Sequence, residues 1–225
     1  TEADLTPRMD MTARVKAYGL VAVDASTGVA IGQDDKADPA KAGFKRRVRL
    51  TTEAPLFAVK TTARPGDVLR VYILRDGDGD GDFEYPAEVV VQNTSAAAQK
   101  VAMAPPGLPA GEYQVWVQGY VVPASPSTFD IEVEALHGTD LELAGLPHEL
   151  EAGRTYSMAV CVPTPTGDPG PLHGMVAFDY GYAPRSVMVP VTWQRWPAGE
   201  PTPGPTAAAL RGVVLLPDLR VGQRR

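Results

Sequence analysis

The sequence predicts an all-β protein made of two antiparallel β-sandwich modules in series, of the jelly-roll or immunoglobulin-like kind. Short runs of β-branched and aromatic residues recur along the 225 residues, and turn residues separate them. No helical period of apolar residues persists. The 22 glycines and 22 prolines follow no repeat, which favours many turns and few long helices. Together these observations indicate antiparallel modules of the sandwich or barrel type.

The first 45 residues are expected to form an arm and a β-hairpin. Residues 1–9 are polar, and residues 13–23 show the alternation of a strand. Turn residues at 24–28 separate this strand from a return strand that begins at 29–31. The hairpin is therefore available to complete a sheet in another part of the protein.

A first sandwich is expected over residues 46–136. Alternating apolar residues recur there, with turns of glycine, proline and aspartate between them. The run at 112–120 is a clear strand of period two. The expected strands are residues 47–51, 56–60, 68–74, 87–91, 99–103, 112–120 and 128–135.

A second, smaller module is expected over residues 137–195. Its expected strands are residues 140–143, 155–162, 175–179 and 186–193. This length is small for a sandwich, so we expect the module to take strands from residues 11–31 or from a neighbouring molecule. Residues 196–225 begin as a linker rich in proline and glycine, and residues 210–216 are either a lone strand or part of a tail.

Several short motifs lie in residues 56–135: Gly-Asp at 66–67 before a strand, an aspartate-rich segment at 76–82 and the run PAGEYQVWVQGY at 109–120. On these motifs, residues 56–135 resemble the bacterial prepeptidase C-terminal domain, which follows the catalytic domain of secreted bacterial proteases. The runs LEAGRTY at 150–156, LHGMVAF at 172–178 and VMVPV at 187–191 make residues 150–191 similar to the fibronectin-III-like module of subtilisin-type proteases.

The resemblance implies an extracellular, non-catalytic accessory region of a secreted subtilisin-like (S8) protease. Such a region would stabilise the enzyme or bind a substrate or a cell surface. Its partners would be the protease catalytic domain, further copies of the chain, or a protein or polysaccharide surface. Two features depart from the family: the acidic segment is longer and interleaved with glycine, and residues 1–45 match no family.

Charge and cysteine content bear on partners and compartment. A formal charge of −6 and a pI near 5.1 argue against nucleic acid or an anionic membrane as the main partner. No apolar stretch reaches the roughly 18 residues that span a membrane. The single cysteine, Cys161, lies in a run typical of a buried strand, so we expect it to be a small core residue. A secreted protein with so few cysteines suggests another source of stability such as calcium, and a start at Thr1 suggests a processed piece.

The acidic segment is the sharpest candidate for a site, and it matches a calcium loop. Asp76, Asp78 and Asp80 stand at positions 1, 3 and 5 of the pattern Asp-x-Asp-x-Asp-Gly. Gly81 follows at position 6, where calcium loops turn sharply. Acidic side chains so close together repel one another without a counter-ion. The pattern therefore predicts a calcium ion as the bound metal.

The second half of this loop fits the pattern less well. Asp82 would offer its backbone carbonyl from position 7, and Glu84 would act from position 9. Position 12, usually a bidentate glutamate, is Ala87, and Glu88 comes one residue late. The alternative interpretation is a solvated acidic hairpin loop in which Asp-Gly pairs are ordinary turn residues.

Catalytic chemistry has little support in the sequence. The three histidines, His137, His148 and His173, all lie near glycine or proline in contexts that favour turns. No Gly-x-Ser-x-Gly motif and no zinc spacing of histidines occurs. We therefore expect no catalytic residues, no organic cofactor and no enzyme activity in this chain.

Two other functions remain open from the sequence. The polar arm and the strand patterns near both ends suggest a structural subunit of an extracellular filament or surface layer, assembled by β-strand addition. Aromatic residues suggest a carbohydrate platform, although Trp116 is expected to pack in a core. The aromatic residues in question are Tyr113, Trp116, Tyr120, Tyr180, Tyr182, Trp193 and Trp196.

Overall fold

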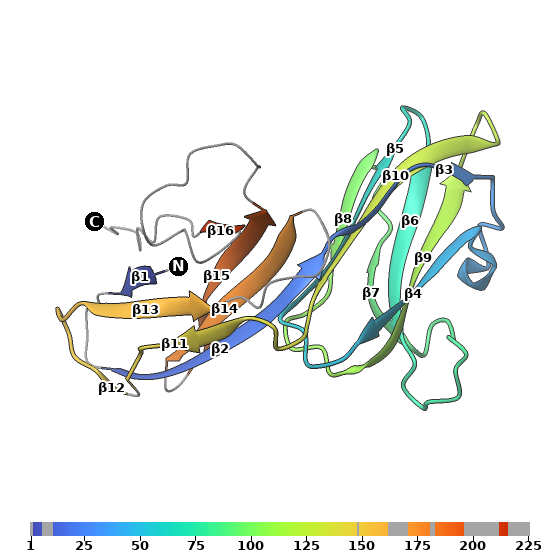
Figure 1. The fold of residues 1–225 in the computed structure, drawn as a ribbon. Coiled ribbons are helices and arrows are strands. Elements are labelled where there is room, and N and C mark those ends of the chain that lie inside the picture. Colours follow the sequence, from blue (N-terminus) through green and yellow to red (C-terminus); the bar gives the residue numbers. More distant parts are fainter. Residues whose placement is uncertain are drawn as a thin grey trace, which may run out of the picture. The chain divides into compact units, whose positions relative to one another are not determined.

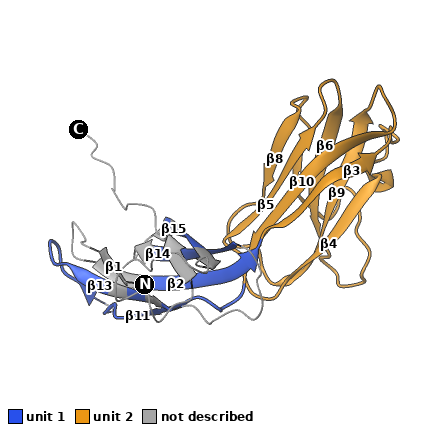
Figure 2. Ribbon diagram, turned by 45° about the horizontal axis from the view of Figure 1, so that its top comes forward, with its two compact units in different colours: residues 1–22, 138–225 blue, residues 23–137 orange. Residues whose placement is uncertain are grey.

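A computed structural model describes residues 2–5, 11–147, 149–161, 171–180, 183–195 and 212–215. Within these residues the regular elements are antiparallel strands and one 3₁₀ turn, η1 (Pro39–Lys41), which confirms the all-β class. No helix in the described part of the chain is long and apolar enough to cross a membrane. The chain forms two compact units: unit 1 comprises residues 1–22 and 138–225, and unit 2 comprises residues 23–137 (Figure 2).

Unit 2 is an eight-stranded sandwich of two four-stranded sheets (Figure 1). One sheet has the order β3-β10-β5-β8 and the other the order β4-β9-β6-β7. Successive strands change sheet except at β6–β7, which are neighbours, and this is the strand order of a jelly roll. The strands are β3 (Asp24–Ile31), β4 (Phe44–Leu50), β5 (Leu56–Ala63), β6 (Val68–Arg75), β7 (Val89–Asn93), β8 (Gln99–Met103), β9 (Gly111–Val121) and β10 (Ser127–Leu136).

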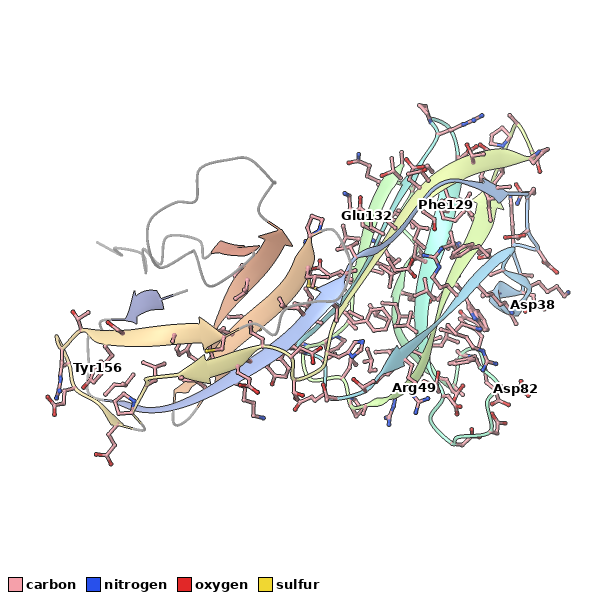
Figure 3. All side chains as sticks on the ribbon, in the orientation of Figure 1. Asp38, Arg49, Asp82, Phe129, Glu132 and Tyr156 are labelled. Carbon is pink, nitrogen blue, oxygen red and sulfur yellow. The ribbon has the colours of Figure 1, made fainter. Side chains whose placement is uncertain are left out.

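The core of unit 2 follows from the alternation of its strands. Tyr113, Val115 and Val117 on β9 point between the sheets and are fully buried, together with apolar residues of β5, β6 and β10. Phe57 packs edge-on against Tyr113, with ring centres 5.6 Å apart. Phe129, labelled in Figure 3, meets Phe44 in the same way at 5.5 Å. These contacts join the two sheets.

Unit 1 is a second two-sheet arrangement, with sheet orders β1-β13-β11 and β12-β2-β14-β15-β16. Its described core contains Leu141, Leu172, Val176, Phe178 and Val191. The strands are β1 (Glu2–Leu5), β2 (Met11–Ala22), β11 (Glu142–Ala144), β12 (Glu149–Leu150), β13 (Tyr156–Cys161), β14 (Leu172–Tyr180), β15 (Ala183–Arg195) and β16 (Gly212–Leu215).

The N-terminal residues are shared between the two units. Strand β2 pairs with β14, for example Ala17 opposite Val176, and so completes the larger sheet of unit 1. Strand β3 pairs with β10 in unit 2, and residues 24–28, expected as a turn, lie inside β3. The chain therefore changes unit at residues 22–23, whereas the alternation of residues 13–31 suggested a hairpin. Alternation identifies strands and their faces but does not identify their partners.

Unit 1 also contains two features for which the sequence makes specific predictions: residues 210–216 and Cys161. Strand β16 pairs with β15, so residues 212–215 are a strand of a sheet. Cys161 is exposed, and the expectation that it is a small core residue is wrong. It is the last residue of β13 and lies opposite Glu142, the first residue of the short strand β11.

Candidate metal site on the β6–β7 loop

The acidic segment is the loop that joins β6 to β7, and its base is closed by hydrogen bonds. The backbone N–H of Arg75 donates to the carbonyl of Glu88 (3.0 Å), and the N–H of Asp76 donates to the carbonyl of Glu112 on β9 (3.0 Å). The Glu88 carboxylate accepts the N–H of Gly77 and the N–H of Glu84, the latter at 3.0 Å. One side chain therefore holds both sides of the loop together.

Three carboxylates converge inside this loop. One oxygen each from Asp76, Asp78 and Asp80 lies within 4.8 Å of the others. Gly79 and Gly81 have φ values of +80° and +88°, and a Cβ at either position would meet nothing. Glycine adopts this left-handed backbone without the steric cost that other residues meet. The alternation of aspartate and glycine thus turns the chain so that successive carboxylates face one region.

The backbone of the loop orients each of these carboxylates. Asp76 accepts from Gly79 (2.6 Å) and Gly81 (3.1 Å) through its two oxygens. Asp78 accepts the N–H of Asp80 at 3.2 Å, and Asp80 in turn accepts the N–H of Asp82 at 2.8 Å. An ionised carboxylate has about four acceptor positions. Each side chain is therefore held by one or two backbone bonds and keeps lone pairs for a cation.

Asp82 and Glu84 do not join the three-carboxylate group. The structure leaves both side chains exposed, and Asp82 is labelled on the loop in Figure 3. The sequence predicts that Asp82 contributes to a calcium site through its backbone carbonyl. This carbonyl comes directly after the turn at Gly81. Glu84 is held through its backbone by Glu88. Glu88, which the calcium-loop pattern marks only as a ligand one residue late, instead joins the two sides of the loop through backbone N–H groups, and no sequence motif signals this role.

The loop lies on a second apolar cluster on the outer face of the β4-β9-β6-β7 sheet. Phe83 packs there against the buried cluster of Ala42, Tyr72, Leu74 and Trp116, in which Trp116 is only 1% exposed. Arg47 on β4 donates to the carbonyl of Gly81 at 2.8 Å, and its guanidinium lies 5.5 Å from the Phe83 ring. The acidic tip is therefore attached to the sheet by an apolar contact and by a cation.

The buried position of Trp116 confirms its expected packing in a core. Tyr113 is also fully buried, so neither ring is available as a carbohydrate platform. Tyr120 is half-buried under Arg70, whose guanidinium lies 3.4 Å from its ring centre. Tyr182 and Trp196 lie outside the described residues, and nothing is described of the side chains of Tyr180 and Trp193.

The histidines are not gathered at this site. His137 is the last residue of unit 2, and its Nδ1 lies 3.0 Å from the Thr51 hydroxyl. His173 lies on β14 of unit 1, and His148 falls outside the described residues. A serine–carboxylate pair does occur in unit 2, since the Ser127 hydroxyl donates to Asp67 at 2.5 Å, but both residues are buried. The expectation of a non-catalytic chain stays a prediction.

Comparisons with known proteins give no family. No family model matches the sequence, and no curated protein matches it. Among solved structures, the chain has a distant match in one described as "Structure of infectious bursal disease virus Gx strain". The sequence identity is 12% and the TM-score is 0.21. The match covers 88% of this chain and 45% of that one, so this chain spans less than half of its length. A likeness this distant identifies neither a fold family nor a function.

Proposed function

We propose that this chain is a non-catalytic extracellular accessory region whose jelly-roll unit is stabilised by calcium. The observation that carries the proposal is the convergence of Asp76, Asp78 and Asp80 within one loop, with Gly81 in the left-handed turn. Calcium prefers oxygen ligands on flexible loops and takes six to eight of them. The three carboxylates supply oxygen ligands only, which favours calcium over zinc or copper.

The remaining ligands are supplied by the second half of the loop and by water. The backbone carbonyl of Asp82 and the side chain of Glu84 follow the turn in the order that calcium loops use. Water is also among the ordinary oxygen ligands of calcium. The five acidic residues Asp76, Asp78, Asp80, Asp82 and Glu84 therefore remain the proposed metal set, with the first three as side-chain ligands.

Calcium would stabilise unit 2 through the attachment of the loop. Three carboxylates within 4.8 Å repel one another, and a divalent cation replaces that repulsion with attraction. The loop is tied to β6, β7 and β9 by its backbone and to the outer cluster by Phe83. A cation that rigidifies the loop therefore also holds Phe83 against the outer cluster.

Thermal unfolding with and without calcium tests the metal site. A ligand that binds only the folded state stabilises it by about 2.7 kcal/mol at 100 times its Kd. For a unit of this size that gain corresponds to a rise of roughly 10 °C or more in Tm. The double variant Asp78→Asn/Asp80→Asn should lose the rise, because asparagine keeps the acceptors for the loop hydrogen bonds but removes the charge.

The matched control is Asp140→Asn/Glu149→Gln. It removes the same charge from two exposed carboxylates of unit 1 and should keep the full calcium response. Isothermal titration calorimetry on the three proteins gives the stoichiometry. If wild type and the loop variant respond equally to calcium, or neither responds, the acidic segment is an ordinary hairpin loop.

The resemblance of residues 56–135 and 150–191 supports the accessory role in a secreted subtilisin-like protease. Under this proposal the partner is the protease catalytic domain, or a protein or polysaccharide surface to which the region holds the enzyme. The encoding gene gives a direct test. A subtilisin-type catalytic domain in the same reading frame would support the proposal, and a frame without any protease domain would contradict it.

One observation favours the alternative of a structural subunit assembled by strand addition. Strand β8 is at the edge of its sheet, and Val101 and Met103 on it are 51% and 57% exposed. Exposed apolar edge strands pair readily with another chain. Asn93 opposes such pairing, because its side-chain amide donates to the Val101 carbonyl at 3.0 Å. Sedimentation at high concentration with calcium decides the matter, since a protein that stays monomeric is not such a subunit.

A further inference from the structure

Two cations of unit 2 lie over one aromatic ring, and a third lies close enough to one of them to be affected by its charge. The guanidinium carbon of Arg70 lies 3.4 Å from the ring centre of Tyr120, and the Lys36 amine lies 5.3 Å from the same centre. Lys100 is close enough for its pKa to be affected: burial lowers it below its usual value, and the charge of Arg70 lowers it further. We call Lys36, Arg70 and Lys100 the basic cluster.

Four parts of the jelly roll bring this cluster together. Arg70 is on β6, opposite Gln118 on β9, and Tyr120 lies two residues further along β9. Lys36 comes from the segment between β3 and β4, whereas Lys100 is on β8 of the other sheet. The cluster is therefore a product of the fold and is not a run of basic residues in the sequence.

The acidic residues beside Lys36 are engaged with other groups. The Asp34 carboxylate accepts the N–H of Gly43 at 2.9 Å and the N–H of Gly119 at 2.7 Å. The Asp35 carboxylate pairs with Lys41 at 3.2 Å. Neither carboxylate forms an ion pair with a member of the basic cluster.

The neutral groups around the cluster give it partners but no negative charge. Lys100 is 2% exposed, and its amine donates to the carbonyl and the hydroxyl of Ser95. Burial raises the pKa of Tyr72, and a side-chain hydrogen bond with Arg70 and the charge of Arg70 partly oppose this effect, so the Tyr72 hydroxyl stays protonated at neutral pH. The Nε of Arg70 is shielded from solvent and has no hydrogen-bond partner.

An uncompensated set of cations on an acidic protein calls for a counter-ion. Among the described residues, no ion pair includes a member of the basic cluster. A cation over an aromatic face gains about 0.5–2 kcal/mol, but the ring leaves the net charge unchanged. Buried or half-buried charges are normally paired, and a planar guanidinium recognises tetrahedral oxyanions through parallel N–H donors.

We propose that the basic cluster binds a tetrahedral oxyanion, phosphate or sulfate, with Arg70 as the contacting residue. The Tyr120 ring holds the guanidinium from one face, and Lys36 and Lys100 add positive potential without a competing carboxylate. The ligand is either a free inorganic ion or the sulfate ester of a polysaccharide, since both present the same oxygens. The site is separate from the acidic loop and does not depend on calcium.

Titration calorimetry with the full chain tests this proposal, using sodium sulfate in one arm and a sulfated disaccharide in the other, at constant ionic strength set by chloride. Wild type should bind at least one of them saturably. Arg70→Gln should weaken that binding about tenfold or more, because it removes a charge-assisted hydrogen-bond donor. Arg64→Gln, the same change on an exposed turn residue, should bind as wild type does.

The two arms also distinguish the source of the anion. Tighter binding of the disaccharide identifies a sulfate ester, and equal binding identifies the free ion; either result supports the site if Arg70→Gln loses it. If Arg70→Gln fails to fold, Lys36→Gln on the exposed segment replaces it, with an expected loss of about two- to fivefold. The proposal is overturned if neither compound binds wild type saturably, or if the variants at Arg70 and Lys36 bind as tightly as wild type does.

Discussion

Lys100 is a buried lysine whose contribution to the stability of unit 2 depends on its protonation state. Its side chain points inward from an edge strand, and its charge is held in place by neutral oxygens of Ser95 and not by a carboxylate. A buried cation without an anionic partner is costly, so the folded state favours the uncharged amine more than the unfolded chain does. This imbalance makes the contribution of Lys100 to stability depend on pH.

We expect the difference in unfolding free energy between wild type and Lys100→Met to change with pH. Burial, and then Arg70, lower the folded-state pKa of Lys100 below its usual 10.5. Between those two values the unfolded chain holds a proton that the folded protein has lost, so stability rises with pH. The wild type should gain stability relative to the variant as pH approaches 10.5, and this gain should be absent at neutral pH.

Urea unfolding of both proteins across this pH range measures the effect. Burial raises the pKa of Tyr72 and of Tyr113, which lowers stability at alkaline pH, but both tyrosines remain in the variant and their contributions cancel. A difference that is the same at every pH would mean that Lys100 has equal proton affinity in the folded and unfolded states.

At the scale of elements, the segment between β3 and β4 packs on β9 at a point where only glycine fits. A Cβ added to Gly119 would lie 1.9 Å from the carbonyl oxygen of Gly32, which is a backbone atom that cannot rotate away. The Asp34 N–H donates to the Gly119 carbonyl at 2.9 Å, and the Gly119 N–H donates to the Asp34 carboxylate. Close backbone contact thus fixes this segment beside the basic cluster.

Gly119→Ala is expected to destabilise the protein by about 3 kcal/mol or more, because the methyl group forces two backbones apart. Gly32→Ala is the matched control, since its Cβ would meet only the Ser125 hydroxyl at 3.6 Å. That control should be close to neutral in urea unfolding. Equal stability of the two variants would contradict the close packing of this segment on β9.

At the scale of the whole molecule, each described apolar core lies entirely within one unit. The two clusters of unit 2 draw only on residues 29–135, and the two clusters of unit 1 draw only on residues 15–20 and 141–191. A domain with its own core can fold alone. Unit 2 is therefore expected to be independent of the strands that flank it in the sequence.

A fragment of residues 23–137 should fold and unfold cooperatively, because it contains both sheets of the jelly roll and all of their core. Dispersed amide signals in an NMR spectrum and a sigmoidal urea transition would support this. A collapsed fragment that has strand content but no fixed side-chain signals would show that unit 2 needs the rest of the chain.

Much of the fold could be predicted from the sequence, and the failures have a common cause. The alternation in β6, β9 and β10 identified these strands and their buried faces, and the regular aspartates identified the β6–β7 loop. The pairing partners of β2 and β3 could not be predicted, because pairing between strands that are distant in the sequence leaves no local pattern. Trp116 is buried in a cluster to which Phe83 is added from a loop, and Glu88 acts through backbone N–H groups that no motif marks.

The insertion of unit 2 between β2 and the rest of unit 1 has a consequence for synthesis of the chain. As the polypeptide leaves the ribosome, β2 emerges before unit 2, and its partner β14 emerges only after unit 2 is complete. Domains fold as units during synthesis, so the jelly roll can reach its native state while β2 still has no sheet to join. An unpaired strand of this length is prone to join other chains. We therefore expect the nascent chain to be most prone to association in the period between translation of β2 and translation of β14.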